Sequence, residues 1–213
     1  MCNIERVKRI IKCLEQDYPD DLCSLQYAKD YELLFCVRLA AQCTDERVNK
    51  IAPALFARFP TLESFAEGPV EDVERLVFST GFYRAKARDI VAASQMLLSD
   101  FGGRVPGNME DLLKLPGVGR KTANLILGDV FQVPGAVVVD THCIRIANRM
   151  GLVTGKDPAK IESALRDILP KEASNDFCHR LVLHGRAVCT ARKPLCEVCS
   201  CAPYCNYFSG GLS

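Results

Sequence analysis

Apolar residues recur along this chain at the spacing of amphipathic helices, and the alternation of a half-buried strand is almost absent. Near the N-terminus the spacing predicts an amphipathic helix, whose apolar stripe is Ile4, Val7, Ile11 and Leu14. One short run, Ala136 to Val139, could form a strand, but it is too isolated to need a sheet partner. The pattern therefore predicts an all-α fold.

Capping residues mark where several of these helices begin. Asp157 is followed by Pro158, the combination of an N-cap with proline at the first helical position. Asn108 can cap a second helix, and Thr44 or Asp45 can start a third. Neither internal repeats nor low-complexity segments interrupt the series, so we expect a folded chain throughout.

Composition sets wider limits. With 213 residues, of which 48% are hydrophobic, the chain can bury one large core or two small ones. No apolar run is long enough to cross a membrane, because charges such as Arg38, Arg120 and Asp129 interrupt each one. The N-terminal stripe carries acidic residues and does not resemble a signal peptide. We therefore expect a cytoplasmic protein that is neither secreted nor membrane-bound.

Charge is unevenly distributed, although the formal net charge is only +1. Taken singly, each basic cluster is typical of an ordinary solvated helix face. If the clusters converge on one face, that face can bind phosphates. They are Arg84, Lys86 and Arg88; Arg120 and Lys121; Arg145 and Arg149; and Arg186, Arg192 and Lys193.

Four cysteines near the C-terminus have the spacing of a metal site. Cys189, Cys196, Cys199 and Cys205 are separated by six, two and five residues, and four thiolates can hold a zinc ion or an iron–sulfur cluster. Disulfides or buried free thiols are the alternatives. Cys201 lies too close to Cys199 for the usual ligand step, so we exclude it. The remaining cysteines are scattered and predict core or surface positions: Cys2, Cys13, Cys23, Cys36, Cys43, Cys143 and Cys178.

A glycine turn separates two apolar helical segments at Leu115 to Lys121. Gly117 and Gly119 allow unusual torsions and close backbone approach, and the amides at the start of the next helix can bind an anion such as a phosphate. A simple helix–helix turn is the alternative. A dinucleotide-binding loop fits less well, because it needs a preceding strand and a longer glycine pattern.

Lys121 and Asp140 carry the candidate chemistry. Lys121 can clamp a phosphate, or it can act as a nucleophile if the helix N-terminus, Arg120 and partial desolvation disfavour its ammonium form. Asp140 directly follows the apolar run and is expected to be an N-cap. A capping carboxylate can also serve as a base or stabilise a developing cation.

Together these segments resemble the endonuclease III family of DNA base-excision glycosylases over essentially the whole chain. Leu115 to Lys121 resembles its helix-hairpin-helix, Val139 to His142 its catalytic aspartate segment, and His184 to Cys205 its cluster loop. Two further segments, Ala41 to Asp45 and Gly81 to Ala87, resemble its duplex-penetrating loops.

The resemblance implies a role for each matching residue. Lys121 would attack the sugar C1′ of a damaged nucleotide, form a Schiff base and cleave the strand, while Asp140 assists. The four cysteines, Cys189, Cys196, Cys199 and Cys205, would hold a 4Fe–4S cluster. Gln42 would fill the gap left by the extruded nucleotide, and Phe82 would wedge the opposite strand. Further contacts to double-stranded DNA are implied for Gly117, Gly119, Arg120, His142, Arg192 and Lys193.

The implied architecture has two helical lobes with DNA bound in a cleft between them. The central lobe would span residues 22–135, and residues 1–21 with 136–213 would form the cluster lobe of a monomer. The chain departs from the family pattern at Phe82, where an aliphatic wedge is familiar, and at Leu113, Cys143 and Cys201.

The implied activity is that of a bifunctional glycosylase and AP lyase acting on oxidised pyrimidines. A monofunctional mismatch or adenine glycosylase is one alternative, although such enzymes commonly lack the lysine, and the adenine type usually adds a C-terminal domain for which we expect no room after Cys205. A non-catalytic DNA-binding module is the other.

Overall fold

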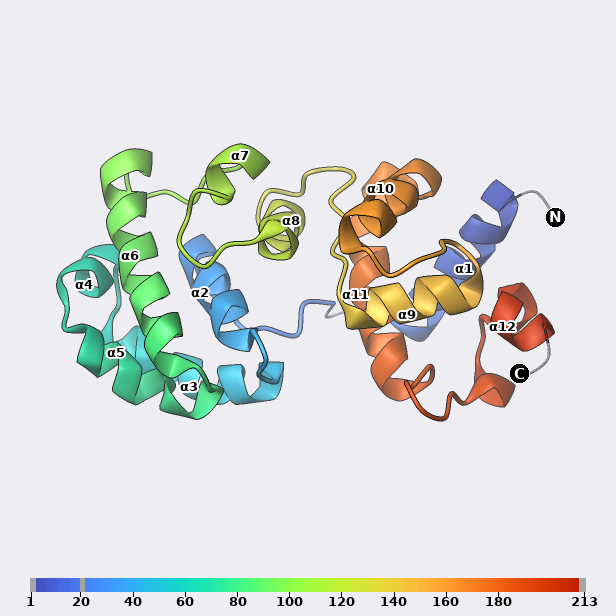
Figure 1. The fold of residues 1–213 in the computed structure, drawn as a ribbon, viewed down its shortest axis with the longest axis horizontal. Coiled ribbons are helices and arrows are strands. Elements are labelled where there is room, and N and C mark those ends of the chain that lie inside the picture. Colours follow the sequence, from blue (N-terminus) through green and yellow to red (C-terminus); the bar gives the residue numbers. More distant parts are fainter. Residues whose placement is uncertain (1–2, 20–21, 211–213) are drawn as a thin grey trace. The chain divides into compact units, whose positions relative to one another are not determined.

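A computed structural model describes residues 3–19 and 22–210, and all regular structure in them is helical (Figure 1). The run Ala136 to Val139 is buried but forms no strand within the described residues. The predicted all-α fold is therefore confirmed. Cys2, one of the scattered cysteines, lies outside the described residues.

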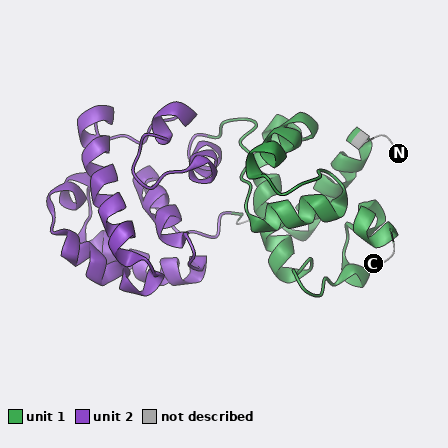
Figure 2. Ribbon diagram, in the orientation of Figure 1, with its two compact units in different colours: residues 1–22, 132–213 green, residues 23–131 purple. Residues whose placement is uncertain are grey.

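The chain divides into two compact units (Figure 2). Unit 2 comprises residues 23–131, and unit 1 combines residues 1–22 with residues 132–213. The central lobe expected from the sequence, residues 22–135, begins one residue before unit 2 and ends four residues after it. The cleft expected between the lobes stays a prediction.

Unit 2 is built around its longest helix, α6, which packs against α4, α5 and α2. The helix begins at Tyr83, within the segment Gly81 to Ala87 that resembles a duplex-penetrating loop, and ends at Phe101 before Gly102 in the left-handed conformation. The elements of the unit are α2 (Asp30–Ala40), α3 (Asp45–Arg58), α4 (Leu62–Glu67), α5 (Val70–Val77), the 3-10 turn η1 (Phe78–Thr80), α6 (Tyr83–Phe101), α7 (Met109–Leu112) and α8 (Arg120–Asp129).

Three aromatic rings form the centre of the unit 2 core. Phe65 of α4 packs edge-on against Phe35 of α2, with ring centroids 5.1 Å apart, and it stacks on Phe59 at 4.9 Å. All three side chains are almost fully buried. Large buried rings contribute much of the apolar area of a small core, so this cluster holds the α2 and α4 helices together.

In unit 1, α11 packs against both α1 and α9. The predicted N-terminal helix is confirmed as α1, and its stripe residues Val7, Ile11 and Leu14 are buried, whereas Ile4 is 63% exposed. The elements of the unit are α1 (Asn3–Asp17), α9 (Thr141–Met150), α10 (Pro158–Ile168), η2 (Lys171–Ala173), α11 (Ser174–Ala187), η3 (Cys196–Val198), η4 (Ala202–Tyr204) and α12 (Asn206–Ser209).

The predicted helix starts are confirmed by their caps. Thr44 accepts a hydrogen bond from the Arg47 amide at the start of α3. Asn108 caps α7, and Asp157 caps α10 with Pro158 at its first position. Each side chain satisfies an amide that the helix itself leaves without a partner.

We predict that Phe65→Ala lowers the free energy of unfolding by about 3–5 kcal/mol, because it removes a ring that contacts both Phe35 and Phe59 and leaves a cavity. Phe78→Ala is the matched control, since Phe78 is 64% exposed, and we expect a loss of less than about 1 kcal/mol. Urea unfolding measures both. Equal losses would contradict the assignment of Phe65 to the core centre.

Candidate functional site

The glycine turn between α7 and α8 uses its two glycines differently. Gly117 has a φ of +75°, and an added Cβ would lie 2.7 Å from Nε of Arg38 and 2.8 Å from a carboxylate oxygen of Asp89. Gly119 has an ordinary φ of −103°, and nothing within 4 Å would obstruct a side chain there. Gly117 is therefore required by backbone conformation and packing. Gly119 leaves open space beside the start of α8.

The start of α8 has the features of an anion site. Gly119 occupies the N-cap position and offers no side chain to the first amides of the helix. Arg120 and Lys121 follow in its first turn, and both side chains are exposed. Helix dipole and basic side chains both favour a phosphate here. Because Lys121 is exposed, the protein alone does not supply the partial desolvation expected from the sequence.

Asp140 caps α9, as predicted. Its carboxylate accepts a hydrogen bond of 2.7 Å from the Cys143 amide, which fixes the side chain at the helix start. His142 lies in the first turn of α9, and its Nδ1 is 3.2 Å from a guanidinium nitrogen of Arg145. A carboxylate held by a backbone amide is oriented in advance for electrostatic work.

Gln42 and Phe82 share an uncommon backbone conformation. Both are non-glycine residues with positive φ, 56° for Gln42 and 48° for Phe82, and both side chains are exposed. Only one other non-glycine residue in the described part of the chain, Gln132, has a positive φ. Such conformations cost energy and often occur at functional loops. Here they present two exposed loop tips in unit 2.

The four predicted metal ligands line one pocket in unit 1. Cys189, Cys196, Cys199 and Cys205 lie around it, whereas Cys201 is buried and does not line it. Within the described residues, no three His, Cys, Asp or Glu side chains are arranged to hold a single metal ion. The donor set is nevertheless one of four soft sulfurs facing a common space, which fits a metal–sulfur group.

Electrostatics within the pocket also suits a metal–sulfur group. Burial raises the pKa of Cys196, and the neighbouring Cys189, Cys199 and Cys205 raise it further, as expected for thiols gathered closely. A hydrogen bond from Cys201, together with interactions with His184, lowers the pKa of Cys199 to about 4. Cys199 is therefore suited to be a thiolate ligand at neutral pH, because ligation requires the deprotonated sulfur.

His184 is a residue whose role the sequence did not reveal. It is fully buried in α11, with Nε2 3.5 Å from the Cys199 sulfur and Nδ1 3.3 Å from the Tyr18 hydroxyl. A hydrogen-bonded histidine behind a metal ligand can orient that ligand. His184 lies in the segment that resembles the cluster loop, which was the available signal. Its contact with Tyr18 depends on the tertiary packing of α1.

Arg145 and Arg149 form one of the basic clusters that the sequence left open as a solvated helix face or as part of a phosphate-binding face, and the structure shows both side chains bonded within the protein. Arg145 donates to the carbonyl oxygens of Gly185 and Cys189, and Arg149 donates to those of Thr190 and Ala191. They hold the backbone of the cysteine loop. Further along that loop, Arg192 and Lys193 are exposed, as a phosphate-contacting role requires.

Unit 2 thus brings together Gln42, Phe82, the glycine turn and Lys121. Unit 1 carries Asp140, His142, the four cysteines, Arg192 and Lys193. Lys86 was also expected on a basic surface, and this expectation was wrong, because its side chain is fully buried. Leu113, one of the positions at which the sequence departs from the family pattern, is 43% exposed.

Known proteins resemble this chain over most of its length. Residues 35–171 match the model of the HhH-GPD superfamily of base excision DNA repair proteins. An endonuclease III from Synechocystis sp. is 45% identical over 201 residues, which are 94% of this chain and 92% of the relative. The chain belongs to the endonuclease III family.

Other relatives and solved structures extend this family assignment. The endonuclease III of Escherichia coli is 38% identical, with 93% of each chain covered. A structure of a trapped endonuclease III–DNA covalent intermediate matches over the full length of both chains, with 35% identity and a TM-score of 0.91. A thermostable thymine-DNA glycosylase is 25% identical over 96% of this chain, with a TM-score of 0.82. Because a thymine-DNA glycosylase and endonuclease III structures both match this fold, the fold alone does not select the substrate.

None of the helices in the described ranges combines the length and the apolar character needed to cross a membrane.

We predict that replacing any one of Cys189, Cys196, Cys199 or Cys205 by serine removes most of the protein-bound metal, because a four-thiolate site loses a ligand. Cys201→Ser is the matched control, and it should retain the metal because Cys201 does not line the pocket. Iron and zinc analysis of the purified proteins, with visible absorbance, measures the outcome. Metal loss in Cys201→Ser but not in Cys205→Ser would overturn this ligand set.

Proposed function

We propose that this chain is a bifunctional DNA glycosylase and AP lyase that removes oxidised pyrimidines from duplex DNA in base excision repair. The observation that carries the proposal is Lys121, an exposed amine in the first turn of a helix that begins at an open glycine turn. A phosphate bound at that turn would place the adjacent sugar near the amine. Family membership and the trapped covalent intermediate of a relative support the same chemistry.

In the proposed reaction, the neutral Nζ of Lys121 attacks C1′ of the damaged nucleotide. The bond between C1′ and the base breaks, and the base leaves with the bonding electrons and gains a proton. The C1′–O4′ bond of the sugar ring then breaks, O4′ takes up a proton that the amine has given up, and the opened sugar is left joined to Lys121 as a Schiff base at C1′. Loss of a proton from C2′ expels the 3′ phosphate with the electrons of the C3′–O bond. Hydrolysis of the Schiff base by water restores the lysine.

Asp140 is proposed to act on the same sugar. Its carboxylate would stabilise the positive charge that develops on the sugar ring as the base departs, and it would accept or return protons in later steps. The Cys143 amide already holds this carboxylate in the free protein. Less reorganisation is then needed when the substrate arrives.

Extrusion of the damaged nucleotide would rely on the two exposed loop tips. Gln42 would occupy the vacated position in the stack, and Phe82 would wedge the opposite strand, which offsets part of the unstacking cost of a few kcal/mol. Phosphate contacts are proposed for Gly117, Gly119, Arg120, His142, Arg192 and Lys193. Most of these groups can position the duplex without reading its sequence.

We propose a 4Fe–4S cluster as the group held by Cys189, Cys196, Cys199 and Cys205, because the four thiols line one pocket and the resemblance to the endonuclease III family implies such a cluster. When bound, the cluster would supply iron–thiolate bonds that cross-link the loop. Arg145 and Arg149 hold the backbone at the start of that loop, which carries Arg192 and Lys193. The group's proposed role is therefore structural.

The proposed place of action is the cytoplasm, and in a bacterium the nucleoid, because the substrate is genomic DNA. Free thiols such as Cys36, Cys143 and Cys178 are buried in the structure and agree with a reducing compartment.

We predict that Lys121→Ala abolishes borohydride trapping of a covalent complex with an abasic-site duplex, since no amine remains to form the Schiff base. Lys114→Ala is the matched control, because Lys114 is also exposed, precedes the same turn and bonds to Asp111. We expect it to trap normally. Gel electrophoresis of the trapped adduct checks the result. Trapping that survives Lys121→Ala would refute the role of this lysine.

We predict that the two functions of Asp140 separate in a pair of variants. Asp140→Asn retains a capping oxygen and should keep the unfolding free energy, whereas Asp140→Ala should lose about 1 kcal/mol. Both should slow base excision by about 100-fold or more, because both remove the charge. Single-turnover excision and urea unfolding measure the two effects. Normal excision by Asp140→Asn would restrict Asp140 to its capping role.

A further inference from the structure

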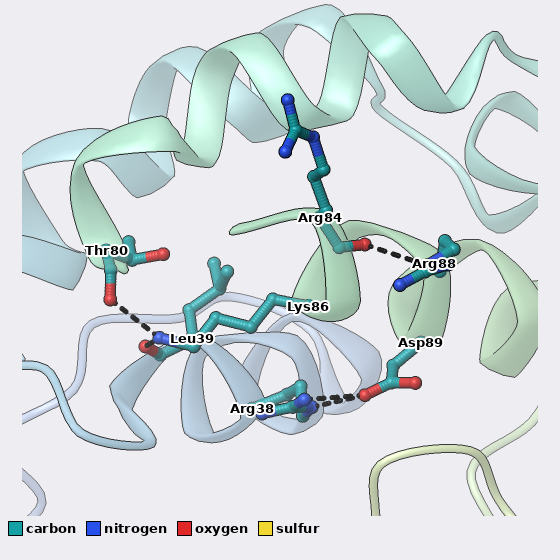
Figure 3. Close-up of polar contacts among 7 residues, drawn as sticks. All are labelled: Arg38, Leu39, Thr80, Arg84, Lys86, Arg88 and Asp89. Carbon is teal, nitrogen blue, oxygen red and sulfur yellow. Dashed lines mark hydrogen bonds and ion pairs between the residues drawn. The ribbon is translucent and has the colours of Figure 1, made fainter. Parts of the chain in front are cut away.

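Lys86 is a buried cation outside the residues assigned to the reaction. Its side chain is fully buried in the first turn of α6, and its Nζ donates 2.8 Å hydrogen bonds to the carbonyl oxygens of Leu39 and Thr80 (Figure 3). Among the described residues it forms no ion pair with a carboxylate. Burying an ammonium group is costly unless its protons are satisfied, so the two carbonyl bonds are its main local compensation.

The two acceptors precede the two exposed loop tips. Leu39 lies at the C-terminal end of α2, three residues before Gln42, and Thr80 ends η1, two residues before Phe82. Carbonyl groups at helix C-termini lack intrahelical partners and attract cations. A single ammonium group on α6 therefore hydrogen-bonds to the backbone at the start of both loops.

Further hydrogen bonds hold the backbone beside each loop tip. The backbone amide of Lys86 donates to the Phe82 carbonyl at 3.1 Å, and the Thr80 hydroxyl donates to the Val77 carbonyl at 2.8 Å. On the other loop, the Cys43 amide donates to the Ala40 carbonyl at 3.0 Å. Gln42 thus lies inside a hydrogen-bonded turn, and the carbonyl of Phe82 is bonded to the first turn of α6.

The next turn of α6 reaches the glycine turn in a similar way. Asp89 accepts bonds of 2.7 Å from both Nε and a terminal nitrogen of Arg38, the residue before Leu39 (Figure 3). Both side chains lie against Gly117, where a Cβ would approach them within 2.8 Å. The first turns of α6 thus contact the three loops of unit 2 that the proposed function assigns to DNA.

We propose that Lys86 is a positioning residue that fixes the Gln42 and Phe82 loops at one spacing, so that both tips enter the duplex together during nucleotide extrusion. This inference rests on the proposed function. Burial lowers the pKa of Lys86, and the two carbonyl bonds offset part of the cost of keeping its proton. Lys86 does not touch the substrate, and the Schiff base chemistry at Lys121 does not require it.

Lys86→Met tests the proposal, because methionine fills nearly the same length but donates no hydrogen bond. Leu97→Ala is the control for lost stability, since Leu97 is a fully buried residue of the same helix. Single-turnover base excision from a duplex with an oxidised pyrimidine should slow by about 10- to 100-fold in Lys86→Met. Strand cleavage at an abasic site in single-stranded DNA, where no stack opens, should change by less than about threefold.

Leu97→Ala should leave the ratio of these two rates close to that of the parent. An equal slowing of both reactions in Lys86→Met would overturn the proposal, as would the same selective slowing in Leu97→Ala. Either result would assign Lys86 a role in stability alone.

A double-mutant cycle tests whether Lys86 acts through the loop tips. In a Gln42→Ala/Phe82→Ala background, Lys86→Met should slow duplex excision by less than about twofold further, because the side chains that it positions are already gone. The same fold loss in both backgrounds would contradict action through these tips.

Hydrogen exchange in the free protein provides a readout that needs no activity. Lys86→Met should speed hydrogen exchange of two backbone amides, that of Cys43 and that of residue 86. The Val130 amide, which donates to the Ile126 carbonyl in α8, should exchange as in the parent. If the parent protein excises the damaged base but hydrogen exchange in the two loops is the same in Lys86→Met as in the parent, the positioning role is overturned. A parent that excises nothing overturns the proposed function, whatever the exchange data show.

Discussion

Backbone groups at helix ends need hydrogen-bond partners, and this requirement organises both units. The chain is made of short helices, so such ends are frequent. Thr44, Asn108, Asp140 and Asp157 satisfy helix N-termini with their side chains, and Lys86 satisfies carbonyls at the C-terminal ends of α2 and η1. The loop that carries Gln42 is thereby fixed at both ends, by Lys86 at Leu39 and by Thr44 at the start of α3. The segments with functional side chains start from these fixed points.

The same requirement separates two kinds of helix start in the candidate site. Asp140 uses its own carboxylate to cap α9, which also fixes that carboxylate for chemistry. Gly119 provides no side chain to α8, which leaves the positive helix end for an external anion beside Lys121. One start carries the proposed catalytic charge and the other the proposed phosphate site. The difference depends on a single residue at each N-cap.

Buried cations show how tertiary structure changes the meaning of a charge pattern. Lys86 lies between exposed Arg84 and Arg88 in sequence, yet only Lys86 is buried, because it faces α2. Arg145 and Arg149 likewise hold carbonyl groups of the cysteine loop. A run of basic residues on a helix can therefore contain both side chains that face solvent and side chains that hydrogen-bond to the protein's own backbone. Helical rotation of about 100° per residue assigns each one to a face.

The sequence by itself determined the helical class, the capped starts at Thr44, Asn108 and Asp157, and the cap at Asp140, because these depend on apolar spacing and on side chains that bond within three residues. It also indicated the four cysteines and Lys121 through local motifs. Only the tertiary structure decided that Lys86, Arg145, Arg149 and His184 bond within the protein, because each of them has a partner at least 40 positions away in the sequence. Burial and long-range hydrogen bonds depend on how helices pack, and local spacing does not encode that packing.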